Sequence, residues 1–212
     1  MKKLSVLFLT LLLLVGCTNA SIESTYFSGL SQALPVAANN TKPYYRYYLP
    51  PHVGVRAQDQ TSSILMVDGH EILMNLMVQN IVSKTFEYEA VEKNIKKTPI
   101  FEEETTYIDL NGNSQNMNVR VYELNTGELA IFVDNQKIEL VSVVLSSSVN
   151  ITLETMIIIL KSTEVFDDKV VLAYSNKQIS KNSGTYSEFF EQVPPETGTL
   201  REMYDSINPD NQ

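Results

Sequence analysis

The chain has 212 residues, 43% of them hydrophobic, and a formal net charge of −9. That length suits one globular domain with flexible ends, and the hydrophobic fraction is enough to form a core. The acidic balance argues against a nucleic-acid partner, because such binding relies on lysine and arginine to neutralise phosphates. Cys17 is the only cysteine, which excludes an intrachain disulfide and cysteine-based zinc or iron–sulfur sites.

The N-terminus has the pattern of an export signal. Lys2 and Lys3 precede an apolar run over residues 4–15 that is too short to cross a bilayer as a helix. The run ends in Leu14-Val15-Gly16-Cys17, which resembles the signal peptide and lipobox of bacterial lipoproteins. The resemblance covers residues 1–17 and implies that Cys17 receives a diacylglyceryl group and becomes the new N-terminus. Two acyl chains hold a protein stably on a membrane, so we expect a lipid anchor on the outer face of a bacterial membrane.

An ordinary secretory signal is the alternative, because Thr18-Asn19-Ala20 offers a small-x-small cleavage site. On either interpretation Lys2 and Lys3 are removed with the signal, so the exported chain has a more negative net charge than the full sequence. Its charge therefore does not favour docking on anionic headgroups, and the anchor has to be the lipid on Cys17.

Composition divides the chain into four parts. We expect a signal peptide at residues 1–16, the lipidated cysteine with a flexible tether at 17–43, a β-rich globular domain at 44–178 and an acidic flexible tail at 179–212. The tether is polar and small, and the tail is rich in proline, glycine and acidic residues. Two apolar-bearing stretches in the tail, 188–193 and 200–207, are either incidental or segments that fold against a partner.

The first strong structural signal is a hairpin. Residues 62–67 and 71–79 flank Asp68-Gly69, a pair that favours a two-residue type I′ turn. The second arm carries apolar residues on both faces, which predicts a strand covered on both sides.

Residues 105–145 predict a four-stranded antiparallel meander. Turn signals at Asn111-Gly112, Asn125-Thr126-Gly127 and Asp134-Asn135 separate four strand-like runs, at 105–110, 113–124, 128–133 and 136–145.

The apolar face of such a sheet needs a cover, and residues 151–163 are the best candidate for a packed helix. Asn150 can cap it and Lys161 lies near its end, as the helix dipole favours. The β-branched run Ile157-Ile158-Ile159 also fits a buried strand. Residues 169–174 look like one more strand. The expected fold is therefore α+β and predominantly antiparallel β, with a meander, an N-terminal hairpin and one packed helix.

The most unusual local cluster is Tyr44-Tyr45-Arg46-Tyr47-Tyr48. Tyrosine and arginine are enriched at binding hot spots, so these five residues are the candidate partner-binding site. The alternative is a strand whose tyrosines cover the sheet; a small-ligand site is a further possibility. On a strand, Tyr44, Arg46 and Tyr48 share one face, and Tyr45 and Tyr47 the other.

No catalytic or metal-binding set stands out, and we expect no cofactor. Asp109-Leu-Asn111-Gly-Asn113 resembles the start of a calcium loop, but an EF-hand needs glycine and glutamate where Ser114 and Arg120 stand. His52 and His70 have no metal-ligand spacing. Glu102-Glu103-Glu104, preceded by Lys93, Lys96 and Lys97, predicts an exposed connection.

The function expected from these features is that of a membrane-anchored extracytoplasmic lipoprotein, a protein-binding or accessory component of a cell-envelope assembly. Its partners are then the bilayer, through acylated Cys17, and an envelope protein. An envelope hydrolase or a small-ligand-binding lipoprotein is the alternative.

Overall fold

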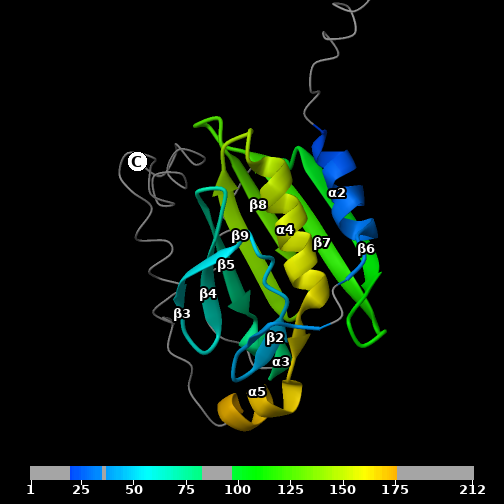
Figure 1. Cartoon of the computed structure of the whole chain (residues 1–212), viewed down its shortest axis with the longest axis vertical. Helices are drawn as coiled ribbons and strands as arrows, with labels where there is room; N and C mark the ends of the chain where they lie inside the picture. Colours follow the sequence, from blue (N-terminus) through cyan, green and yellow to red (C-terminus); the bar gives the residue numbers. More distant parts are fainter. Residues whose placement is uncertain (1–19, 35–36, 83–96, 176–212) are drawn as a thin grey trace, which may run out of the picture.

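A computed structural model of the chain describes residues 20–34, 37–82 and 97–175. These residues form an α+β fold dominated by one seven-stranded antiparallel sheet, in the order β3-β4-β5-β9-β8-β7-β6, with a small sheet in the order β1-β2-β10 beside it (Figure 1). The elements are α2 (Ile22–Ser31), β1 (Asn40–Thr41), β2 (Tyr45–Tyr47), β3 (Gly54–Gln58), β4 (Ser62–Val67), β5 (His70–Leu76), α3 (Val78–Ile81), β6 (Phe101–Ile108), β7 (Ser114–Glu123), β8 (Leu129–Asp134), β9 (Ile138–Val144), α4 (Val149–Ser162), β10 (Glu164–Val165) and α5 (Asp167–Tyr174).

The hairpin around Asp68-Gly69 is confirmed. β4 pairs with β5 from Ser62↔Asn75 to Val67↔His70. Asp68 and Gly69 have φ angles of 48° and 79°, as a type I′ turn requires at both central positions. Gln79 does not extend the strand, because β5 ends at Leu76 and α3 begins at Val78.

Strands β6 to β9 pair antiparallel in chain order, and β9 also pairs with β5. The hairpin and the later strands are therefore parts of one continuous sheet. Glu102-Glu103-Glu104 lies within β6, at an edge of this sheet, rather than in a connection. Charged side chains on an edge strand discourage pairing with another chain.

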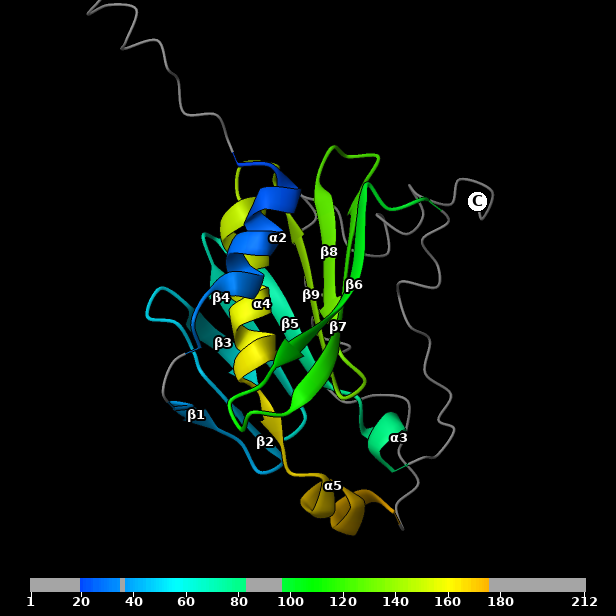
Figure 2. The same ribbon diagram turned by 90° about the vertical axis from the view of Figure 1, so that its right-hand side faces the viewer.

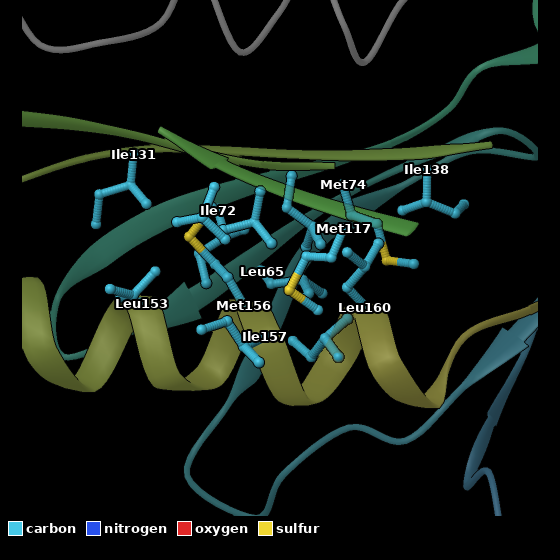
Figure 3. Close-up of a cluster of buried hydrophobic side chains, with 14 of the residues drawn as sticks. Leu65, Ile72, Met74, Met117, Ile131, Ile138, Leu153, Met156, Ile157 and Leu160 are labelled. Carbon is cyan, nitrogen blue, oxygen red and sulfur yellow. The ribbon is translucent and has the colours of Figure 1, made fainter. Parts of the chain in front are cut away.

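The main core lies between the sheet and α4. Leu153, Met156, Ile157 and Leu160, spaced as one face of a helix, point at the sheet and are fully buried (Figure 3). Burying side chains of this size contributes about 1.5–3 kcal/mol each. This packing decides between helix and strand for the isoleucine run, in favour of the helix.

Asn150 does not cap α4. Ser148 occupies the N-cap position, and the Asn150 side-chain amide instead donates to the Ala20 carbonyl oxygen at 2.8 Å.

Two sequence-based predictions about local structure are wrong. Residues 169–174, expected as a strand, belong to helix α5, which Asp167 and Asp168 favour by their place in its first turn. The expected tether at 17–43 contains α2, which packs along α4 (Figure 2), and β1. Residues 22–31, expected in the tether, therefore belong to the folded domain. The signal peptide at 1–16 and the tail at 179–212 lie outside the described residues.

A second apolar cluster lies on the face of the sheet opposite α4, as the alternation of side chains along the strands requires. It contains Ile64, Leu73, Tyr122, Leu124, Ala130, Phe132 and Val141. The expectation that β5 is covered on both sides therefore holds, since its neighbouring residues Ile72 and Leu73 are both fully buried on opposite faces.

Candidate functional site

Helix α2 is held to the domain by a tight contact with α4 near its C-terminal end. Gly29 lies against Ile157, where an added Cβ would approach the isoleucine side chain to 3.2–3.3 Å. Ile157 is fully buried and cannot yield easily. Glycine at position 29 therefore permits the two helix backbones to come this close.

Lys161 holds the same C-terminal end of α2 through hydrogen bonds. Its ammonium group donates to the carbonyl oxygens of Gly29, Leu30 and Gln32 at 3.2, 2.5 and 2.9 Å. These carbonyls belong to the C-terminal end of α2, where intrahelical donors are lacking and the helix dipole favours a cation. Burial lowers the pKa of Lys161. The position of Lys161 near the end of α4 was predicted, but its role as a clamp on another helix was not, because α2 had been assigned to the tether.

Side chains of the tyrosine cluster alternate between a buried and an exposed face along β2. Tyr45 and Tyr47 are fully buried, with rings stacked at 5.9 Å between centroids. The Tyr45 hydroxyl lies 3.4 Å from Ser63 Oγ, and burial raises the pKa of both phenols. These two tyrosines form part of the core, so they are not accessible to a partner in this structure.

The other half of the cluster stays at the surface. Arg46 is exposed and pairs with Glu164 on β10 at 2.5 Å, while Tyr44 and Tyr48 are partly exposed. The Tyr44 ring contacts Tyr174 of α5 at 5.4 Å. α5 also exposes Val171 and Leu172, by 42% and 84%. Partner binding through Tyr44, Arg46 and Tyr48 stays a prediction.

A polar pocket of about 180 Å³ is lined in part by β10. β10 and α5 lie at the end of the molecule away from the first turn of α2 (Figure 1). Its lining consists mainly of amide and charged side chains: Tyr107, Asp109, Asn111, Asn113, Gln115, Asn135, Lys137, Thr163, Glu164 and Val165. Sequence reasoning treated the two turns that build it separately, because their proximity depends on strand register.

Asp109 organises one wall of this pocket. Its carboxylate accepts from the backbone N–H groups of Asn111 and Asn113, both at 2.9 Å, and from Gln115 Nε2 at 3.1 Å. Burial alone would raise the pKa of Asp109, but these hydrogen bonds outweigh burial and hold it below its usual value. The motif is thus a hairpin turn, as expected, whose carboxylate is already engaged by protein donors.

Tyr107 and Asn135 form the other wall. Asn135 Nδ2 donates to the Tyr107 hydroxyl at 3.0 Å, while Asn135 Oδ1 accepts from the backbone N–H groups of Lys137 and Ile138. Burial raises the pKa of Tyr107 to about 12, so the phenol stays protonated and can donate to an acceptor in the pocket. The arrangement suits hydrogen bonding to a small polar molecule.

The two histidines do not line the polar pocket. His52 Nε2 lies 3.0 Å from Thr155 Oγ1, and His70 begins β5 beside the hairpin turn. Within the described residues, no group of three or more His, Cys, Asp or Glu side chains is placed to hold a metal ion.

No protein-family model, curated protein or solved structure matches this chain. Of the helices in the described part of the chain, none combines the length and the apolar character needed to cross a membrane.

Proposed function

We propose that this protein is an extracytoplasmic lipoprotein, anchored through diacylated Cys17 to the outer face of a bacterial membrane. In this proposal it serves as a protein-binding or accessory component of a cell-envelope assembly. The observation that carries the proposal is the lipobox-like Leu14-Val15-Gly16-Cys17, followed only four residues later by Ser21, the N-cap of α2. A lipid on Cys17 would hold a folded domain close to the membrane.

The arrangement of the domain supports an outward-facing binding end. Because α2 begins close to Cys17, the opposite end of the molecule would point away from the membrane. That end carries Tyr44, Arg46 and the exposed Leu172. It also holds two turns of strands β6 to β9, which we interpret as the expected four-stranded meander. A protein partner reaching the domain from outside would meet this end first.

Metabolic labelling with a fatty acid analogue tests the anchor. The wild-type chain should incorporate the label and sediment with membranes, whereas Cys17→Ser should do neither. Thr10→Ser, which changes the signal but keeps the cysteine, is the matched control and should behave as wild type. Unchanged labelling of Cys17→Ser would overturn the proposal.

A photoreactive residue at position 172 tests the outward-facing end. We expect a discrete protein adduct in cells from position 172, and none from position 27, where Phe27 is also exposed by 52% but lies on α2. Replacing Arg46 with Glu should reduce the adduct, since arginine contributes strongly at interfaces. Equal adducts from both positions would contradict a partner surface at this end.

The polar pocket favours a second candidate, a lipoprotein that binds a small polar ligand. Tyr107 can donate to such a ligand, and the exposed amides of Asn111 and Asn113 can both donate and accept. A panel of monosaccharides, titrated while amide NMR shifts are followed, should perturb residues 107–115 and 135–137 for at least one sugar. Tyr107→Phe should then weaken that response, and the absence of shifts for every sugar would count against this candidate.

A further inference from the structure

The chain enters the domain beside a small face that carries no charge of its own. Asn150 Nδ2 donates to the Ala20 carbonyl oxygen at 2.8 Å, so the start of the described chain is hydrogen-bonded to the first turn of α4. The loop before α4 turns back here through the Ser148 N–H to the Leu145 carbonyl, at 2.9 Å. We call residues 145–151, together with Ala20 and Ser21, the apical face.

Two exposed apolar side chains mark the apical face. Leu145 is 53% exposed and Ile151 is 41% exposed, and the residues between them are three serines, a valine and an asparagine. The loop therefore combines branched apolar side chains with small polar ones, and it has no lysine, arginine, aspartate or glutamate. A lone exposed apolar side chain needs no explanation, but this pair lies where the anchored chain would meet the lipid.

Chain length places the apical face at the membrane if Cys17 is acylated. Only Thr18 and Asn19 lie between Cys17 and Ala20, so the two Cα atoms are at most about 11 Å apart when the chain is fully extended. α2 is tied to α4 near both of its ends, because Asn150 donates to the Ala20 carbonyl just before it and Lys161 holds the carbonyls at its C-terminal end. The two helices also run in the same direction, and their first turns lie at the same end of the molecule (Figures 1 and 2).

We infer that the apical face is a second membrane contact, in which Leu145 and Ile151 enter the interfacial region of the bilayer beside the lipid on Cys17. The partner is the lipid surface itself, and the inference rests on the proposed acylation of Cys17. Apolar side chains at a surface bind the interface through buried apolar area. The contact fixes the orientation of the domain, which directs its opposite end outward.

Charge around the apical face indicates which lipids suit it. Glu23 lies in the first turn of α2, and Asp68 accepts a hydrogen bond from Ser148 Oγ at 2.7 Å. Residues 20–34 and 145–160 contain no lysine or arginine. The contact should therefore be closer on zwitterionic phosphatidylcholine than on vesicles rich in anionic phosphatidylglycerol, and added salt should not weaken it on phosphatidylcholine.

Acylation leaves the mature chain without a free thiol, so a single introduced cysteine can carry a fluorescent label. Leu145→Cys and Ile151→Cys report on the apical face. Leu172→Cys and Val55→Cys, at positions exposed by 84% and 39%, are the matched controls. The lipidated proteins are reconstituted in phosphatidylcholine vesicles that contain a lipid-borne quencher.

Labels at positions 145 and 151 should be quenched roughly threefold more than labels at 172 and 55, as expected for side chains in the interface. Ile151→Asp should reduce quenching at position 145, whereas Val171→Asp should leave it unchanged. Equal quenching at all four positions in an acylated, vesicle-bound protein would overturn the inference and leave the proposed anchor intact. A chain whose Cys17 thiol stays free and that does not float with vesicles would overturn both.

Discussion

Replacing Lys161 with methionine tests the clamp between α4 and α2. Methionine keeps much of the aliphatic stem but removes the three donors that reach the carbonyls of Gly29, Leu30 and Gln32. Hydrogen bonds to a charged group contribute about 1.5–3 kcal/mol each, but three that share one ammonium group do not add fully. Burial of the charged ammonium is itself unfavourable and lowers the pKa of Lys161. The methionine variant avoids this cost, which offsets part of the loss. We therefore expect Lys161→Met to reduce the free energy of unfolding by about 2–4 kcal/mol.

Urea unfolding of the soluble chain that begins at Thr18 measures this loss. With a slope of about 2 kcal/mol per molar, the midpoint should fall by about 1–2 M. Lys169→Met is the matched control, because Lys169 is exposed and only lies over the Phe166 ring at 4.2 Å. It should change the free energy of unfolding by less than about 1 kcal/mol.

A second variant separates the clamp from a general loss of packing. Gly29→Val should also detach α2, because its side chain would collide with Ile157. The double variant should then cost clearly less than the sum of the two single variants. A loss for Lys161→Met as small as for Lys169→Met, or full additivity with Gly29→Val, would refute the clamp.

Two further predictions concern the tyrosine core and the Asp109 turn. Tyr47 is fully buried, and its hydroxyl makes no hydrogen bond of ordinary geometry among the described residues, with Ser63 the polar side chain beside it. Tyr47→Phe should therefore be neutral or slightly stabilising, whereas Tyr47→Ser should cost about 3–5 kcal/mol in thermal or urea unfolding. A large loss for Tyr47→Phe would show that Ser63 pairs with the hydroxyl. The folded-state pKa of Asp109 lies below 3.8, so its contribution to stability is complete above that value and is lost as pH falls through the lowered pKa. Asp109→Asn should therefore flatten the fall of the urea midpoint between pH 5 and roughly pH 2, and an unchanged pH profile would contradict the hydrogen-bonded turn.

Local patterns in the sequence predicted the hairpin and the helix α4. Asp68-Gly69 adopts positive φ angles at low cost, which determines the turn without help from the rest of the fold. The spacing of Leu153, Met156 and Leu160 makes one helical face whatever the partner. The same reasoning wrongly predicted a strand at residues 169–174, because a short apolar run fits a strand and a helix equally well. The acidic start of α5 was the signal that would have favoured the helix.

The candidate surfaces depended much more on tertiary contacts. Alternation along β2 correctly separated Tyr45 and Tyr47 from Arg46, but only the packed structure decides which face is buried. The polar pocket depends on the pairing of strands that bring the Asp109 turn near Asn135 and β10. No local pattern contains that register, because it is set by contacts distant in sequence.

The sequence by itself predicts an export signal that ends at Cys17, and it determined that the chain is acidic and that antiparallel strands dominate it. These properties depend on composition and on neighbouring residues. Only the tertiary structure decided that α2 belongs to the domain, because its docking requires Gly29 against Ile157 and the Lys161 ammonium on its last carbonyls. Those contacts join residues about 130 positions apart, and they place residues of the expected tether within the folded domain.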